Sequence, residues 1–209
     1  TVLFGISIMG NFVVKSENKS KEKKRTAITK EEMKEWAAPD EEMLEYYDLG
    51  EFSTTIPIVY MNTKGQQILK EKAIWGNIAL LDGNEEAQSV SAVPNSIYRA
   101  TIKYRGASSY SKFDKKQYRI EFYKNNKDST KKVSLAGMGA NSEWVLNGPY
   151  LDKTLIRNKL VYDLARELNG WAPDTRFVEL FVDGKYQGVY LAVEPVTNGE
   201  SRLRLAEFG

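Results

Sequence analysis

Residues 144–195 constrain the fold of this chain most strongly, because a complete helix signal is followed there by a complete hairpin signal. Asp152 can accept hydrogen bonds from the unpaired backbone N–H groups at the start of a helix. Asn169 and Gly170 favour a left-handed end to the same helix. Between them, apolar side chains recur every three or four residues, which predicts one apolar stripe. The stripe consists of Leu155, Ile156, Leu160, Leu164 and Leu168. We expect a sheet to cover it.

Two alternating runs follow this helix, and Asp183-Gly184 joins them. This dipeptide is the strongest short signal for a two-residue β-hairpin turn. Because side chains alternate along a strand, such a turn also sets the register. The register pairs Phe181 with Tyr186, Phe177 with Tyr190, and Glu179 with Gly188. Glu194 is then expected on the same face as the two tyrosines.

Further strands are predicted upstream of the helix. The alternating or β-branched runs cover residues 55–61, 74–81, 98–104 and 117–123. With the hairpin they make five or six strands against one long helix. The predicted fold class is therefore α+β, with a mostly antiparallel sheet packed by that helix.

The N-terminal quarter differs from the rest of the chain. Residues 1–14 are apolar but shorter than the roughly 20 residues of a membrane-spanning helix. We interpret them as the tail of a signal peptide or membrane anchor, with a buried strand or helix as the alternative. Residues 15–50 form a charged, partly helical arm, and its first lysines count against simple export. The folded domain is predicted over 51–209, at the cell surface or secreted, with or without membrane attachment.

Composition excludes several kinds of chemistry. The 209 residues contain no cysteine and no histidine, which removes disulfides, thiolate nucleophiles, Cys/His zinc sites and histidine acid–base catalysis. The net charge is only +2, from 30 basic and 28 acidic residues, so no overall field attracts nucleic acid. Any catalysis must use Asp, Glu, Lys, Arg, Ser, Thr or Tyr.

Two long motifs resemble one family. The run W-V-L-N-G-P-Y-L-D-K-T-L-I-R-N-K-L begins at Trp144, and R-F-V-E-L-F-V-D-G-K-Y-Q-G-V-Y-L-A-V-E begins at Arg176. Together they resemble the spore-coat protein H (CotH) kinase family, over about Ile56 to Glu194. The resemblance implies a diverged protein-kinase fold, here its N-terminal lobe, and ATP-dependent phosphorylation of Ser or Thr. It also implies ATP and Mg²⁺ as cofactors and a Ser-rich surface or spore-coat protein as substrate.

The loop that begins at Arg105 is the candidate phosphate site. Gly106, Ser108 and Ser109 offer flexibility, hydroxyls and backbone N–H groups that can be aimed at one anion. On spacing alone, a solvated hairpin loop is the alternative. The CotH family has a G-x-S-S loop here, so the resemblance implies contact with nucleotide phosphates.

Two lysines open the strand after this loop. In a kinase-like lobe, a strand lysine neutralises phosphates and a helix carboxylate holds it. Period-two alternation places Lys116 on the face of Tyr118 and Lys115 on the other face. We favour Lys116 if the Tyr118 face lines the cleft, and an ordinary exposed lysine is the alternative. Either Asp163 or Glu167 on the helix could be the acidic partner.

Three more residues support this assignment. Arg157 and Asn158 are polar within an apolar helix, and burying them requires acceptors from the protein or from a ligand. Glu194 precedes Pro195, which disfavours further strand. The resemblance implies that Glu194 marks the hinge between two kinase lobes, where backbone groups bind adenine. A strand-terminating acid is the alternative.

The catalytic residues are expected beyond Gly209. Phosphoryl transfer needs an Asp that positions the hydroxyl, together with ligands for Mg²⁺. Kinases carry these in the second lobe, and no D-F-G-like or H-R-D-like run occurs here. We therefore expect this chain alone to be inactive. The alternative function is a non-catalytic surface or spore-coat interaction module. A carbohydrate-binding β-domain is the third hypothesis, and it would need exposed aromatic side chains at Trp144, Trp171, Tyr186 and Tyr190.

Overall fold

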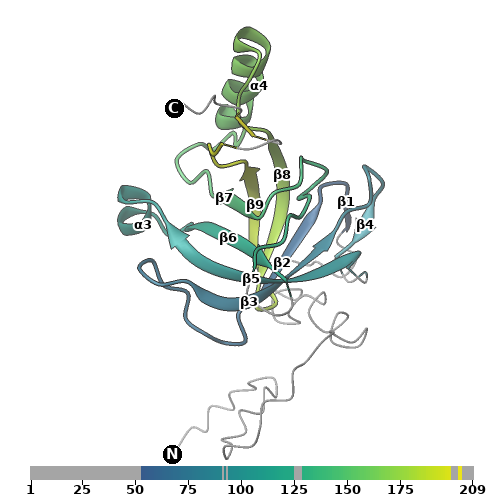
Figure 1. The fold of residues 1–209 in the computed structure, drawn as a ribbon, viewed down its shortest axis with the longest axis vertical. Helices are drawn as coiled ribbons and strands as arrows, with labels where there is room; N and C mark the ends of the chain where they lie inside the picture. The colour runs from purple at the N-terminus through teal and green to yellow at the C-terminus, as the bar shows by residue number, and fades with distance from the viewer. Residues whose placement is uncertain (1–52, 91, 93, 125–128, 199–201, 204–209) are drawn as a thin grey trace, which may run out of the picture.

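A closed β-barrel dominates the structure (Figure 1). The computed structural model describes residues 53–90, 92, 94–124, 129–198 and 202–203. The barrel strands are β2 (Ile58–Asn62), β3 (Ile74–Leu81), β5 (Ser96–Arg105), β6 (Gln117–Tyr123), β7 (Glu143–Asn147), β8 (Thr175–Val182) and β9 (Lys185–Val193). They neighbour one another in the order β2-β3-β5-β6-β7-β9-β8. Every pair is antiparallel except β2 and β8, whose parallel pairing closes the barrel.

The other described elements are small. β1 (Ser53–Thr54) and β4 (Gln88–Ser89) pair as a separate two-stranded sheet. The helices are α3 (Ser108–Lys112) and α4 (Arg157–Asn169). The prediction of an α+β fold, with one long helix packed on an open sheet, is therefore wrong. The chain is mostly β, and its sheet curves into a closed barrel. The kinase N-lobe architecture implied by the resemblance is wrong for the same reason.

The main core lies inside the barrel, so most of the sheet is packed without a covering helix. Alternate side chains of every barrel strand point inward, and these residues form one large buried cluster. Ile120, Trp144 and Leu146 are fully buried there. The segment after β6 adds Leu135 and Met138 to the same cluster. The strands and this segment thus bury their own apolar surface against one another.

The two ends of α4 are formed largely by the predicted residues. The helix begins at Arg157, five residues after Asp152, whose Oδ2 accepts the backbone N–H of Arg157 at 2.9 Å. Leu155 has a left-handed φ of 64°, so the helix cannot begin before it. Asp152 therefore caps the first turn from five residues before the first helical residue. Gly170 ends the helix in the left-handed conformation, with φ of 71°.

The orientation of α4 is the reverse of the prediction. Its half-buried side carries Lys159, Tyr162, Asp163 and Arg166, and Tyr162 packs on the apolar cluster formed by β7 and β9. Arg166 forms an ion pair with Asp174, just before β8, at 3.2 Å. The predicted apolar stripe faces away and stays exposed at Ile156, Leu160, Leu164 and Leu168. In Figure 1, α4 accordingly projects from the barrel.

The β8–β9 hairpin follows the predicted register only near its turn. Phe181 pairs with Tyr186, as predicted. A bulge between Leu180 and Phe181, with Gly188 at φ of 87°, then shifts the pairing by one residue. Phe177 consequently pairs with Leu191, and Glu179 pairs with Val189. The predicted shared face is therefore wrong: Tyr190 joins the barrel interior, whereas Tyr186 packs on an outer cluster.

The predictions for residues 1–14 and 15–50 lie outside the described residues. In the part of the chain that is described, no helix combines the length and apolar character that crossing a bilayer requires.

Two leucine truncations test the distribution of the core. Leu146 is fully buried on β7, whereas Leu151 is 70% exposed before α4. We expect Leu146→Ala to lower the free energy of unfolding by about 2–5 kcal/mol, because it leaves a cavity in the barrel. Leu151→Ala, the matched control, should change it by less than about 0.5 kcal/mol. Urea denaturation measures both, and equal effects would contradict the barrel core.

Candidate functional site

The predicted phosphate-binding residues gather at one end of the barrel. Arg105 ends β5, Gln117 begins β6, and Gly148 directly follows β7, all at this end. Lys115 and Lys116 lie immediately before β6. We call this region the lysine end.

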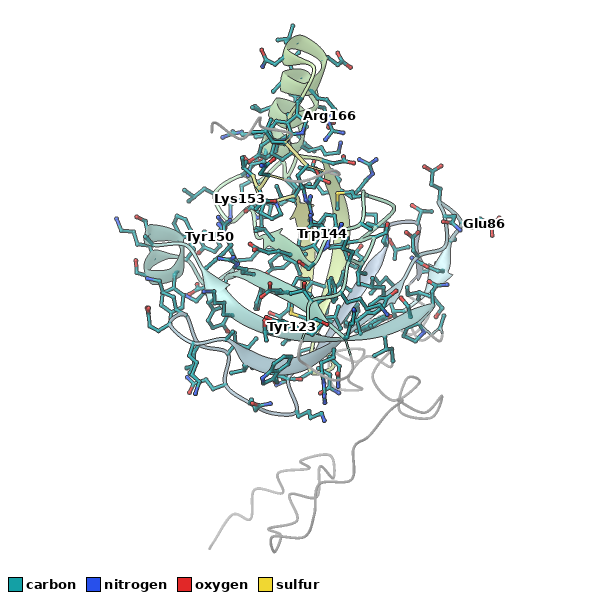
Figure 2. All side chains as sticks on the ribbon, viewed as in Figure 1. Glu86, Tyr123, Trp144, Tyr150, Lys153 and Arg166 are labelled. Carbon is teal, nitrogen blue, oxygen red and sulfur yellow. The ribbon has the colours of Figure 1, made fainter. Side chains whose placement is uncertain are left out.

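The loop at the lysine end is folded on itself. Gly106 has φ of 91°, and the hydroxyl of Ser109 lies so close that a Cβ at position 106 would collide with it. The Nζ of Lys116 donates to the backbone carbonyls of Tyr110 and Phe113, at 2.7 Å each. Phe113 stacks on Tyr150, with ring centroids 5.0 Å apart, and Tyr150 lies near α3 in Figure 2. Lys116 therefore holds the loop closed through its carbonyl groups.

Two of the predicted loop residues remain accessible to a ligand. Ser108, the first residue of α3, is exposed, and so is Arg105. The guanidinium of Arg105 donates to the side chain of Gln117 at 3.1 Å. These groups can still donate to an anion, since a guanidinium carries five N–H donors.

Lys115 is directed toward β9. Its Nζ donates to the carbonyl of Val189 at 2.8 Å and lies 4.6 Å from the ring centroid of Tyr190. The β7–β9 ladder has its last pair at Asn147 and Leu191, so the lysine amine supplies a donor just past the end of the ladder. Gly148 is needed beside it, because a Cβ there would come within 2.9 Å of the Lys115 Cγ.

Glu179 on β8 is the acidic group that acts on Lys115. It is 4% exposed, and the hydroxyls of Tyr186 and Thr54 donate to its two oxygens at 2.5 and 3.4 Å. Burial lowers the pKa of Lys115, and the Glu179 charge opposes that shift. Sequence reasoning missed this partner, although a lone acid inside an apolar strand run was an available signal.

The predicted helix residues take other partners. Asp163 forms an ion pair with Lys159 at 2.6 Å, and Glu167 is exposed. Arg157 and Asn158 open the helix and are exposed, so neither is the buried polar group that we expected. Arg157 forms an ion pair with Asp152 at 3.4 Å.

A row of tyrosines lies inside the barrel at the lysine end. The ring centroid of Tyr118 is 5.3 Å from that of Tyr104 and 5.9 Å from that of Tyr190. Burial raises the pKa values of Tyr118 and Tyr190, so both phenols stay protonated over a wider pH range than a free tyrosine. Tyr190 donates its hydroxyl to the carbonyl of Lys116 at 3.0 Å. Tyr190 thus connects both lysines to the barrel core, because its hydroxyl binds the Lys116 carbonyl and its ring contacts the Lys115 amine.

Glu194 lies away from this loop, in a buried ion pair. Arg202 approaches its Oε1 at 2.7 Å and lies 4.4 Å above the Trp144 ring. Burial lowers the pKa of Arg202, while Glu194 and two further carboxylates oppose the shift. The backbone N–H of Glu194 donates to the Asp174 carbonyl at 3.0 Å. Glu194 lies four positions after Tyr190, about 13 Å along an extended chain.

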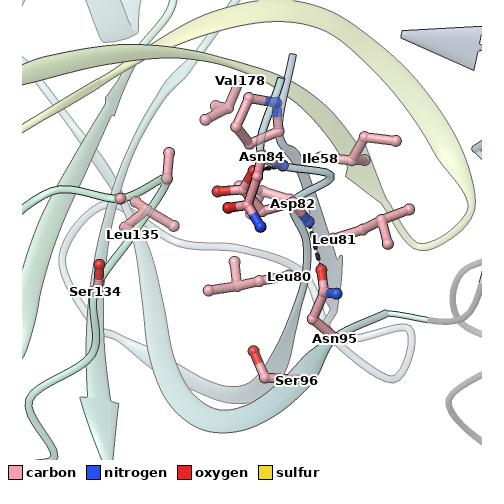
Figure 3. Close-up of a pocket in the computed structure, with 14 residues that line it drawn as sticks. Ile58, Leu80, Leu81, Asp82, Asn84, Asn95, Ser96, Ser134, Leu135 and Val178 are labelled. Atoms are coloured by element: carbon pink, nitrogen blue, oxygen red, sulfur yellow. Dashed lines mark hydrogen bonds between the residues drawn. The ribbon is translucent and has the colours of Figure 1, made fainter. Parts of the chain in front are cut away.

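A cavity, drawn in Figure 3, is lined by the start of β2, the end of β3 and the start of β5, toward the opposite end of the barrel from the lysine end. Its volume is about 380 Å³, and Ser134 and Leu135 face Asp82 and Asn84 across it. Apolar strand residues form much of its lining, and no predicted site residue contributes to it. A second cavity of about 280 Å³ lies beside Glu194, Arg166 and Trp171.

The lysine end itself is cationic and holds no cluster of acidic side chains among the described residues. Within the described ranges, no group of three or more acidic side chains is placed to hold a metal ion. A carbohydrate platform also lacks support, because Trp144 and Tyr190 are 0% and 1% exposed and cannot stack on a sugar.

Two comparisons with known proteins identify relatives. A family model described as "CotH kinase protein" matches residues 102–207, about half of the chain. The inner spore coat protein H of Bacillus subtilis (strain 168) is 39% identical over 95 residues. That match covers 46% of this chain but 23% of the relative, so it spans about a quarter of the relative's length.

The Arg202–Glu194 pair allows a double-mutant test. Arg202→Ala should lower the free energy of unfolding by about 3–5 kcal/mol, because it leaves the Glu194 carboxylate buried without its cation. Adding Glu194→Gln removes that charge and keeps an acceptor for the Asp174 N–H, so the double variant should recover part of the loss. Thermal or urea denaturation measures both. Additive losses would mean that the two groups do not interact.

The half-buried Lys115 amine predicts a pH dependence of stability. Its pKa in the folded state lies below the ordinary 10.5, so between these two values the unfolded chain binds more protons. Stability from this group therefore rises with pH across that window. We expect Lys115→Met to remove the rise, whereas Lys112→Met, at an exposed position, should retain it. Denaturation at several pH values from neutral to 10.5 gives the comparison, and identical profiles would contradict a lowered pKa of Lys115.

Proposed function

The chain belongs to the CotH kinase protein family, and on this basis we propose that the whole protein phosphorylates a surface or spore-coat protein with ATP. In this reaction a Ser or Thr hydroxyl oxygen forms a bond to the γ-phosphorus of ATP. The bond from that phosphorus to the bridging oxygen breaks, ADP leaves, and the hydroxyl proton passes to a base. The lysine end supplies contacts to the nucleotide phosphates.

The observation that carries this proposal is the extent of the family match. Residues 102–207 include the loop after Arg105, both lysines, Gly148 and Glu179. The matched region therefore holds the whole cationic group of the lysine end together with the carboxylate that acts on it. Phosphate groups favour such an arrangement, because positioned cations and hydroxyls stabilise them.

Each residue at the lysine end has a distinct role in this proposal. Lys115 is the principal phosphate contact, because Val189, Tyr190 and Glu179 hold its amine in place. Lys116 shapes the loop through the two carbonyls that it binds. These groups position the nucleotide, and the transfer step itself needs residues that this region does not provide.

The accessible loop residues complete the contacts. Arg105 and Ser108 donate hydrogen bonds to a phosphate group. Gly106 allows the turn its left-handed backbone, and the Ser109 hydroxyl packs against Gly106. Glu194 does not contact the nucleotide in this proposal. Its buried carboxylate holds Arg202 in place through their ion pair.

A non-catalytic surface or spore-coat interaction module is the second candidate. The engagement of both lysine amines with backbone carbonyls favours it, since a ligand would have to compete for them. The relative's name places that protein in the inner spore coat. We extend a spore-coat or surface location to this chain under either function.

A transfer assay on the whole protein separates the two functions. Labelled γ-phosphate is followed from ATP to a Ser-rich acceptor peptide. We expect Lys115→Met to lower transfer by roughly 10- to 100-fold, because a charge-assisted hydrogen bond is lost. Lys112→Met, which removes an exposed lysine on α3, is the matched control and should leave transfer unchanged.

Circular dichroism shows whether each variant is folded. Absence of transfer by the folded, unmodified protein would establish the module instead of the enzyme. Undiminished transfer by folded Lys115→Met would contradict the role given to Lys115.

A further inference from the structure

The outer side of α4 is the most apolar exposed surface in the described residues. Eight large apolar side chains are exposed among the described residues. Five of the eight lie on α4 or at its N-cap. The five are Ile156, Leu160, Val161, Leu164 and Leu168, with exposed fractions of 51–74%. Apolar patches rimmed by polar residues commonly mark interaction surfaces.

The two sides of α4 are reversed relative to a helix that packs only on its own barrel, because the apolar side is the exposed one. Such helices normally bury the apolar side and expose the polar side. Here Lys159, Asp163 and Arg166 lie on the half-buried side and form ion pairs within the chain. Figure 2 shows Arg166 near the base of α4, where the helix meets the barrel. The apolar side is therefore free to meet another molecule.

The sequence of α4 is symmetric about Tyr162. Ile156 and Leu168 are each six residues from it, Leu160 and Leu164 are each two, and Arg157 and Glu167 are each five. At about 100° per residue, all six side chains lie within about 60° of the direction opposite Tyr162. Because Tyr162 packs on the β7–β9 cluster, this symmetric surface lies on the opposite side of the helix.

We propose that α4 packs antiparallel against α4 of a second copy and forms a two-fold symmetric dimer. The two-fold axis passes at the level of Tyr162. Each leucine or isoleucine then meets the residue equally far from Tyr162 on the other side: Ile156 lies opposite the partner's Leu168, and Leu160 opposite the partner's Leu164. A two-fold interface requires this kind of self-complementary surface.

Charge complementarity selects the antiparallel arrangement. It places Arg157 opposite the partner's Glu167 twice in each dimer, whereas a parallel pair would bring like charges together. Within the described part of the chain, Glu167 forms no ion pair. Arg157 is 75% exposed and contacts Asp152 through Nε, which leaves its terminal nitrogens for the partner.

The size of the surface sets the expected affinity. A helix of 13 residues is about 20 Å long, so one helix pair buries less than the roughly 1,600 Å² of a typical stable interface. The dimer should therefore be concentration-dependent, with a dissociation constant in the micromolar range.

Sedimentation equilibrium on the 209-residue chain tests the proposal. The unmodified chain should shift with concentration from 23.8 kDa toward twice that mass. Arg157→Glu and Glu167→Arg each place like charges across the interface, and each should weaken the dimer at least tenfold. The double variant restores opposite charges and should return the dissociation constant to within about threefold of the original. Lys185→Glu, an equal charge change at the exposed β8–β9 turn, is the control and should have no effect.

Three results would overturn the dimer. The first is a monomer at every concentration. The second is a dimer that neither single charge reversal weakens. The third is a double variant as weak as the single variants, because the rescue depends on contact between Arg157 and Glu167 of different copies.

Discussion

The parallel pairing of β2 with β8 determines the rest of this structure. The amides of Glu179 and Asp183 donate to the carbonyls of Pro57 and Met61, at 2.9 and 2.8 Å, and so join the first barrel strand to the hairpin. Once this seam is closed, most of the buried apolar side chains of the sheet lie inside the barrel, and only a small outer cluster on β7 and β9 is left for α4 to contact. The interior is filled by the strands themselves, and α4 is left outside, with its polar side toward the barrel.

Local signals in the sequence predicted local structure well. The runs of strand residues, the Asp183-Gly184 turn and the left-handed end at Gly170 all occur where the pattern indicated. The closure could not be predicted in this way, because the partners Ile58 and Glu179 are far apart in the chain and no periodicity encodes their pairing. The bulge at Gly188 escaped prediction too, since it needs knowledge of the partner strand.

The candidate site shows the same limit. Alternation favoured Lys116 over Lys115, but both precede the first residue of β6, so strand parity does not govern where their amines go. The carboxylate beside Lys115 comes from β8, because barrel closure and the bulge set the position of Glu179. The role of Arg202 was not predicted, because its position above the Trp144 ring depends on the folded structure. Residue types were therefore predictable, and their partners were not.

The seam between β2 and β8 can be measured directly by native-state hydrogen exchange. In a closed barrel, the amides of Glu179 and Asp183 are held by β2 and should exchange only when the whole domain unfolds, as slowly as the amide of Ile120 at the barrel centre. Exchange of these two amides as fast as that of the exposed Leu164 region of α4 would show an open sheet edge. That result would contradict the barrel and the site built on it.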